Sequence, residues 1–90
     1  MVKVEVEVDT LEQLHEAMQL PVDAVLLDNM TPQELAQAVT IVNGRAITEA
    51  SGRVRRETIV PIAASGVDLI SVGWLTHSAP ALDLGLDVSL

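Results

Sequence analysis

Short apolar runs alternate with helical segments along the 90-residue chain, and this alternation constrains the fold more than any other feature. Strands are expected at residues 2–8, 24–27, 46–50 and 69–72, with helices from residue 11 up to Pro21, at 31–42 and at roughly 56–64. Strands that recur with helices between them imply right-handed βαβ units and a parallel sheet. We therefore predict an α/β fold of parallel βα repeats in a single domain, residues 1–90.

Local signals mark where these segments start and stop. Thr31-Pro32-Gln33-Glu34 has the sequence of a capping box, and Asn43-Gly44 is a helix stop. Pro61 lies inside the third expected helix and should weaken or kink it. After the fourth strand, residues 76–79 are expected to form one turn and residues 81–90 a last extended segment.

Composition excludes several classes of protein. A formal net charge of −8 argues against nucleic acid as a main partner, because binding a polyanion needs clustered cations. The absence of Cys excludes a disulfide framework and a thiolate zinc site. No apolar run approaches a membrane span, and the first residues lack the core of a signal peptide, so we expect a cytoplasmic protein without membrane contact.

Four βα units are half of a (β/α)8 barrel, which needs about 200–250 residues. The chain is therefore interpreted as a small open α/β sheet, a half-barrel that dimerises, or a piece of a larger enzyme. The near-absence of aromatic residues, with Trp74 as the only one, favours a core of small aliphatic side chains.

Carboxylates recur at the expected strand ends. Glu7, Asp28 and Glu49 are spaced by 21 residues, and Glu5 shares the polar face of the first strand. Ligands of parallel α/β folds bind at the carboxyl ends of strands. These side chains could bind ribose hydroxyls or Mg²⁺ and stabilise a developing positive charge. The alternative is a solvated strand face and a helix-capping Asp.

Two glycine-containing turns follow the last two strands. Ser51-Gly52 precedes a helix, so its backbone N–H groups could face an anion, and Gly73 closes the fourth strand. The four arginines lie within 12 residues around the first turn and could help to hold phosphate. Alternatively, the glycines are only caps and the arginines are solvated. His77 also follows the fourth strand, but a single His is no catalytic constellation.

Five ordered blocks of sequence resemble the C-terminal barrel segment of the quinolinate phosphoribosyltransferases. The blocks are Glu5-Val6-Glu7-Val8-Asp9, Leu27-Asp28-Asn29-Met30, Glu49-Ala50-Ser51-Gly52, Ser71-Val72-Gly73 with Leu75-Thr76-His77-Ser78-Ala79, and Ala81-Leu82-Asp83-Leu84. The related molybdenum-transport paralogues fit less well at the first and last blocks. The resemblance implies the C-terminal half of a TIM-like phosphoribosyltransferase barrel.

The resemblance also implies a reaction. The family transfers phosphoribose from phosphoribosyl pyrophosphate to quinolinate, uses Mg²⁺, and forms nicotinate mononucleotide, CO₂ and pyrophosphate for NAD synthesis. By resemblance, Glu7 and Asp28 lie near the ribose and the metal. Ser51, Gly52 and Arg53 correspond to one phosphate-binding loop, and Ser71, Val72 and Gly73 to the second. Carboxylates beside a sugar that becomes oxocarbenium-like, with backbone donors around phosphate, suit this chemistry.

Other features depart from the family. Arg53 stands where Gly is common, and Trp74 replaces a small residue. The basic cluster that holds the quinolinate carboxylates is missing, since Lys3 is the only Lys. We therefore expect a fragment, a truncated product or an engineered half-barrel that is inactive alone. The alternative is a non-catalytic structural or assembly module. Open strand edges predict a homo-oligomer in either case.

Overall fold

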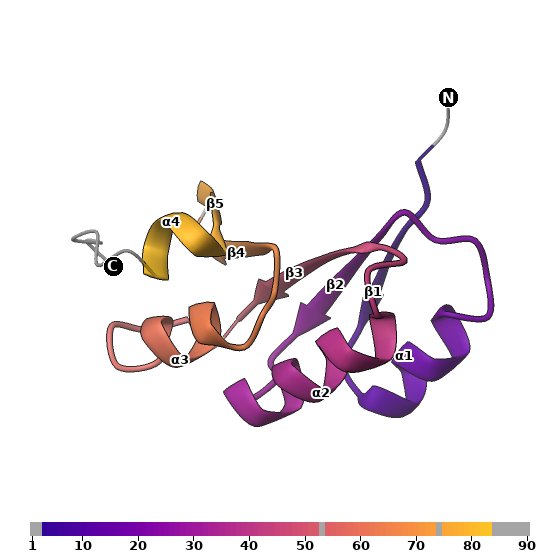
Figure 1. The fold of residues 1–90 in the computed structure, drawn as a ribbon, viewed down its shortest axis with the longest axis horizontal. Helices are drawn as coiled ribbons and strands as arrows, with labels where there is room; N and C mark the ends of the chain where they lie inside the picture. Colours follow the sequence, from indigo (N-terminus) through magenta and orange to yellow (C-terminus); the bar gives the residue numbers. More distant parts are fainter. Residues whose placement is uncertain (1–2, 53, 74, 84–90) are drawn as a thin grey trace.

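The computed structural model describes residues 3–52, 54–73 and 75–83, which form one five-stranded sheet with helices (Figure 1). The strands are β1 (Glu5–Val8), β2 (Ala24–Asp28), β3 (Ile47–Ser51), β4 (Leu69–Val72) and β5 (Leu75–Ser78). The helices are α1 (Leu11–Ala17), α2 (Pro32–Val42), α3 (Ile59–Ala64) and α4 (Ala79–Asp83). The strand order is β1-β2-β3-β4-β5.

The prediction of parallel βα repeats is confirmed for β1 to β4, which pair in parallel. The prediction for the end of the chain was wrong. Residues 75–78 form a strand antiparallel to β4, where we expected a turn at 76–79, and residues 79–83 are helical, where we expected extended structure from residue 81. Gly73, with φ +60°, begins the reversal between β4 and β5. The remainder of the expected extended segment lies outside the described residues.

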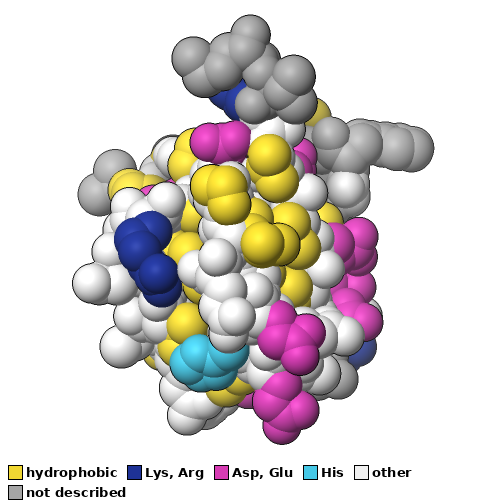
Figure 2. All heavy atoms as spheres, turned by 90° about the vertical axis from the view of Figure 1, so that its right-hand side faces the viewer, with side chains coloured by type: hydrophobic (Ala, Val, Ile, Leu, Met, Phe, Trp, Pro, Cys, Tyr) yellow, Lys and Arg dark blue, Asp and Glu magenta, His cyan; other side chains and the backbone are white. Residues whose placement is uncertain are grey.

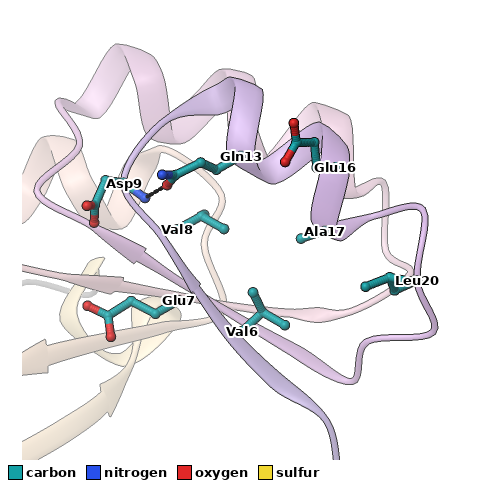
Figure 3. A pocket seen from close by; sticks show the side chains of 8 residues that line it. All are labelled: Val6, Glu7, Val8, Asp9, Gln13, Glu16, Ala17 and Leu20. Carbon is teal, nitrogen blue, oxygen red and sulfur yellow. Dashed lines mark hydrogen bonds between the residues drawn. The ribbon is translucent and has the colours of Figure 1, made fainter.

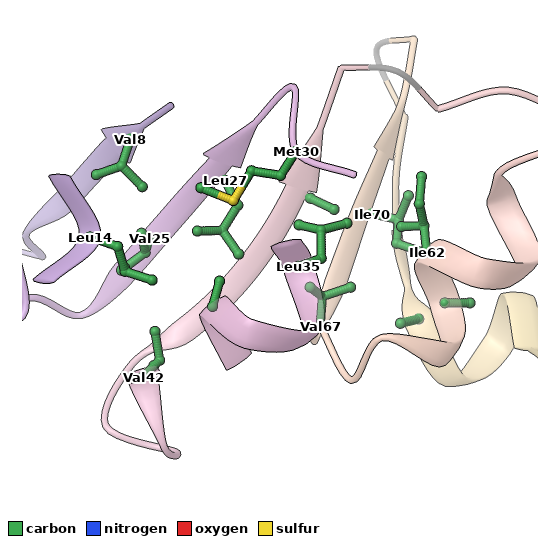
Figure 4. Close-up of a cluster of buried hydrophobic side chains, with 14 of the residues drawn as sticks. Val8, Leu14, Val25, Leu27, Met30, Leu35, Val42, Ile62, Val67 and Ile70 are labelled. Atoms are coloured by element: carbon green, nitrogen blue, oxygen red, sulfur yellow. The ribbon is translucent and has the colours of Figure 1, made fainter. Parts of the chain in front are cut away.

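The core lies between one face of the sheet and helices α1, α2 and α3 (Figure 4). Alternate strand residues such as Val8, Val25, Leu27 and Ile70 point into it and are buried. The helices contribute Leu14, Leu35 and Ile62. Aliphatic side chains fill this layer, as the composition predicts. The face that carries residues 7, 28 and 49 is the other one, because successive strand residues point to opposite sides.

The ends of α2 follow the rules that the sequence indicates. The Thr31 hydroxyl accepts from the N–H of Glu34 at 3.2 Å, and the Glu34 carboxylate accepts from the N–H of Thr31 at 3.0 Å. Asn43 ends the helix in the left-handed region with φ 51°. The capping box predicted from the sequence is therefore confirmed in both of its hydrogen bonds.

Helix α3 is shorter than predicted, because it begins at Ile59 and not near Arg56. The Thr58 hydroxyl accepts from the Arg55 N–H at 2.9 Å, which holds the preceding residues in a turn. Pro61 therefore lies in the first turn of α3, where a backbone N–H has no intrahelical acceptor. The expectation that Pro61 weakens the interior of this helix was wrong for that reason.

Two aspartates accept hydrogen bonds at the edge of the sheet where the parallel strands begin. The Asp68 carboxylate accepts from both the N–H (2.8 Å) and the hydroxyl (3.1 Å) of Thr48, a buried residue. The Asp68 N–H in turn donates to the Thr48 carbonyl at 3.0 Å. Asp23 plays a similar part for β1 by accepting from the N–H of Val4 at 2.7 Å. Both contacts lie at the edge of the sheet opposite to the strand ends that carry the candidate site.

The side of the molecule that carries α1 has apolar side chains grouped among acidic ones (Figure 2). A shallow hollow lies between β1 and α1, and its lining includes Val6, Ala17 and Leu20. Leu20 is 62 % exposed and Val4 is 42 % exposed. Among the residues described, no helix has the length and apolar character to cross a membrane.

Candidate functional site

Three carboxylates meet where β1 and β2 end. Glu7 lies in β1, Asp9 follows the end of β1, and Asp28 is the last residue of β2. Oxygen atoms of the three side chains all lie within 4.8 Å of one another. Figure 3 shows the carboxylates of Glu7 and Asp9 on the same side of β1, while Val8 points toward α1. Alternation along the strand thus places two of the three acids on one face.

The first turn of α1 fixes the chain at this cluster. The Asp9 N–H donates to the Gln13 side-chain oxygen at 2.7 Å (Figure 3). The Thr10 hydroxyl accepts from the N–H of Gln13 at 3.1 Å. Glu7 and Asp9 are exposed, whereas Asp28 is half-buried. Carboxylate oxygens are ligands that hard cations prefer, and they accept hydrogen bonds from hydroxyl groups, so these three side chains could bind a ligand of either kind.

Glu49 does not take the place that its spacing predicted. The register aligns Glu7 with Leu26, and Leu26 with Glu49, so Glu49 lies in the middle of β3. Asp28 is aligned with Ser51 instead. The connections between the strands differ in length, so equal spacing in sequence does not give equal positions in the sheet. Glu49 is therefore level with Glu7, and Asp28 lies two residues further along the sheet, so the expectation that all three acids stand together at the strand ends was wrong.

Glu49 instead contacts the end of β4. The Ser71 hydroxyl donates to the Glu49 carboxylate at 2.7 Å, and the Ser71 and Thr76 hydroxyl oxygens are 3.4 Å apart. Glu49 and Ser71 are both half-buried. A diagonal contact of this type joins neighbouring strands on one face of a sheet. It ties the end of β4 and the start of β5 to β3.

The Ser51-Gly52 turn lies directly beside the carboxylate cluster. Ser51 is paired with Asp28, and its carbonyl accepts from the Asn29 N–H at 2.9 Å. Gly52 has φ +70°, a conformation that favours glycine. Backbone N–H groups in turns with such residues can converge on an anion. The structure therefore brings Glu7, Asp28, Ser51 and Gly52 to one edge of the sheet.

The second predicted loop, Ser71-Val72-Gly73, ends the neighbouring strand. Val72 is half-buried, and Gly73 is exposed with φ +60°. A side chain at Gly73 would meet no atom within 4 Å of its Cβ among the described residues. The glycine is thus required by its backbone conformation and not by crowding from its neighbours. Arg53, the remaining phosphate candidate, lies outside the described residues, as does Trp74.

Three residues lie away from this group. His77 is aligned with the buried Ile70, so its side chain lies on the helix-covered side of the sheet, opposite to Glu49. Glu5 is aligned with Ala24, nearer the starting ends of the strands. Arg45 donates to the carbonyls of Val42 (3.0 Å) and Ile41 (2.8 Å) at the end of α2. It therefore lies at the opposite edge, and the expectation of four arginines around one loop was wrong.

Two neighbours of the cluster were not predicted as site residues. Asp9 appears in the sequence only as the end of a motif, although the same alternation that places Glu7 on one face also places Asp9 there. Asn29 was read only as part of a motif. Its left-handed conformation (φ 55°) has no sequence signal beyond the tolerance of Asn for that region. Its contact with Gly52 requires the three-dimensional structure.

Comparison with known proteins shows a family for this chain. The family model described as quinolinate phosphoribosyl transferase, C-terminal domain, matches residues 1–87. The chain is 39 % identical to a probable carboxylating nicotinate-nucleotide pyrophosphorylase of Methanocaldococcus jannaschii, with 96 % of the chain and 33 % of the relative covered. It is also 39 % identical to a protein of the same name from Bacillus subtilis, with 100 % and 31 % covered.

A solved structure shows the same fold. The crystal structure of the nicotinate-nucleotide pyrophosphorylase from Ehrlichia chaffeensis matches with a TM-score of 0.73 and 43 % identity, covering 77 % of this chain and 25 % of that one. The chain thus spans about a third of the length of the curated relatives. On the match of the family model over nearly all of its residues, the chain belongs to the quinolinate phosphoribosyl transferase family, as its C-terminal domain.

Proposed function

We propose that this chain supplies the ribose- and phosphate-binding part of a quinolinate phosphoribosyltransferase. The reaction would join quinolinate to phosphoribosyl pyrophosphate and release nicotinate mononucleotide, CO₂ and pyrophosphate. The observation that carries the proposal is the meeting of Glu7, Asp9 and Asp28 beside the Ser51-Gly52 turn. Acidic groups for a sugar and backbone donors for its phosphate are adjacent there, in a chain that belongs to this family.

The chemistry explains why acids are useful next to the sugar. The bond between ribose C1 and the pyrophosphate oxygen breaks, and pyrophosphate leaves with the electron pair. The quinolinate ring nitrogen forms the new bond to C1, and the adjacent carboxylate leaves as CO₂ while its ring carbon takes a proton. Positive charge develops on the sugar in the first step, so the Glu7 and Asp28 carboxylates would stabilise it. They would also accept hydrogen bonds from the ribose hydroxyls.

The donor set also fits a magnesium ion. Mg²⁺ prefers oxygen ligands and is usually bound through one or two carboxylates together with substrate phosphates. Asp28 is half-buried and beside the Ser51-Gly52 turn, with Glu7 and Asp9 as further donors. A bound ion would supply neutralising charge to the pyrophosphate group. The residues of the chain would hold the ion, orient the ribose and fix the phosphate.

The quinolinate carboxylates need cationic partners, and this chain has one Lys and four Arg, of which Arg45 donates to the carbonyls at the end of α2. We therefore assign no quinolinate-binding role to the described residues. The chain is proposed to act as one partial barrel unit, residues 1–90, that is inactive alone. A non-catalytic assembly role is favoured by one observation, which is the exposed apolar side of β1 and α1.

Backbone amide shifts of the chain during titration with nicotinate mononucleotide test the proposal. Millimolar binding, or roughly 4 kcal/mol, is expected, with shifts at Ser51, Gly52 and Gly73. Gly44 also has a positive φ but lies at the opposite edge of the sheet, so its amide should stay silent. Asp28→Asn should weaken binding in the presence of Mg²⁺. Shifts confined to other residues, with those three unchanged, would contradict the proposed site.

A further inference from the structure

Asn29 connects the carboxylate cluster to the glycine turn. It follows Asp28 at the end of β2, adopts the left-handed region with φ 55°, and donates its N–H to the Ser51 carbonyl at 2.9 Å. Its side-chain oxygen occupies the space next to Gly52 where a Cβ atom would stand, closer than a real Cβ tolerates. One Asp28 side-chain oxygen lies 3.0 Å from the same point. The side chains of Asp28, the last residue of β2, and of Asn29, which follows it, thus both lie against Gly52.

The segment that holds Asn29 is anchored on both sides. Strand β2 precedes it, and Met30 directly after it is buried, with 2 % of its surface exposed. Thr31 then begins α2 through its capping box. Because Asn29 stands between a paired strand and a capped helix, its left-handed backbone is held by the surrounding structure. An exposed side chain on such a support can restrict a neighbouring loop.

We propose that Asn29 is a positioning residue: its side chain holds the Ser51-Gly52 turn in the conformation that presents backbone N–H groups to a phosphate. The phosphate part of this inference rests on the proposed function. The positioning part rests on the closeness of the Asn29 side-chain oxygen to Gly52; the hydrogen bond to Ser51 comes from the Asn29 backbone N–H and holds the two loops side by side. Gly at position 52 is then needed twice, for its positive φ and because the Asn29 side chain leaves no room for a Cβ.

The chain offers a matched control. Asn43 is the other residue besides glycine with a positive φ in the described parts of the chain, and it lies at the opposite edge of the sheet. Replacing either Asn by Gly keeps the left-handed backbone accessible and removes the side chain. Asn29→Gly should increase the fast motion of the Gly52 amide in ¹⁵N relaxation and weaken the binding of inorganic phosphate about tenfold, while Asn43→Gly should change neither.

A double-mutant cycle isolates the contact. Gly52→Ala should be less harmful in the Asn29→Gly background than in the native one, because the Cβ of Ala then loses its closest clash and keeps only the contact with Asp28. Equal unfolding free-energy penalties in the two backgrounds would overturn the proposal. So would an unchanged Gly52 amide in Asn29→Gly.

Asn29→Asp separates positioning from binding. It keeps a side-chain oxygen and tolerates the left-handed region, so the turn should remain ordered. Its added negative charge should still weaken phosphate binding. If Asn29→Gly loosens the turn but the native chain shows no phosphate binding, the positioning role stands and the proposed function fails. If the native chain binds phosphate and Asn29→Gly binds it equally well with a rigid turn, only the positioning role fails.

Discussion

The hydroxyl of Ser71 donates a hydrogen bond of 2.7 Å to the carboxylate of Glu49 across β3 and β4. With its proton held there, Ser71 has only acceptor capacity left, so phosphate near this loop would need its donors from the backbone. The bond also joins the segment that ends in Ser51-Gly52, through Glu49, to the Ser71-Val72-Gly73 loop, through Ser71. A change at either residue should therefore affect the position of both segments.

Ser71→Ala should lower the free energy of unfolding by about 1–2 kcal/mol, because Glu49 is half-buried and loses a charge-assisted bond. Urea unfolding of the variant measures this. Thr76→Val is the matched control, since the Ser71 and Thr76 oxygens are 3.4 Å apart and the contact is weaker. A larger loss in Thr76→Val than in Ser71→Ala would contradict the assignment.

Asp68→Ala should destabilise the fold by roughly 2–3 kcal/mol, because it leaves the N–H and hydroxyl of the buried Thr48 without their carboxylate partner. Asp23→Ala provides the comparison, since Asp23 accepts one bond from the exposed residue Val4 and should cost less. Thermal unfolding of the two variants ranks them. Equal decreases in stability for the two variants would show that the Asp68–Thr48 pair contributes no more than the Asp23–Val4 bond.

Thr31→Ala should cost about 1 kcal/mol through loss of the cap on α2. Thr40→Ala changes the same residue type within α2, at an exposed position whose hydroxyl bonds only to the Ala36 carbonyl at 3.1 Å. Helix propensity favours Ala there, so that variant should be neutral or slightly more stable. The prediction fails if circular dichroism on heating shows the two variants equally destabilised.

The order of elements follows from the sequence because each strand and helix carries its own local signal. The alternation of residues 2–8 predicts β1, and the capping box at Thr31 predicts the start of α2. Both predictions are confirmed, because these elements depend on local sequence. Strand β5 was missed because it is stabilised by pairing with β4 and has no clear local pattern. Short elements of this kind depend on tertiary contacts that a linear sequence does not display.

The site was predictable to a similar extent. Strand ends meet at one edge of a parallel sheet, so alternation and topology bring Glu7, Asp28 and Ser51 together. Register could not be predicted, because it depends on how each connection packs against the sheet. For this reason the sequence did not predict that Glu49 accepts a hydrogen bond from Ser71. It also did not predict that Asp9 is the third member of the carboxylate cluster.

The structure changes the expected mode of self-association. Strand β5 pairs with β4, so that edge of β4 is not free to accept a parallel strand from a second copy in this conformation. In the part of the chain that the structure describes, β1 pairs only with β2. Its other edge borders the hollow next to Leu20. An unpaired strand edge beside exposed apolar side chains favours pairing with another chain.

Antiparallel pairing of residues 3–5, the segment that leads into β1, with the same segment of a second copy is the arrangement that charge favours. With Val4 opposite Val4 of the second copy, Lys3 lies opposite Glu5 in both directions, and opposite charges at such positions are stabilising. The net charge of −8 opposes association only modestly, because salt screens exposed charges beyond about 8–10 Å. We therefore predict a two-fold dimer formed through residues 3–5 at the start of β1.

Light scattering at low micromolar concentration tests this prediction through a charge swap. Lys3→Glu and Glu5→Lys should each raise the dissociation constant of the dimer roughly threefold or more, because each places like charges opposite one another, and the double variant should restore it. Leu20→Lys should also weaken the dimer. Val60→Lys is the control, because Val60 in α3 is similarly exposed but lies away from β1, and it should leave the dimer unchanged. A stable native monomer, or a double variant that fails to recover association, would show that residues 3–5 do not pair with the same segment of a second copy.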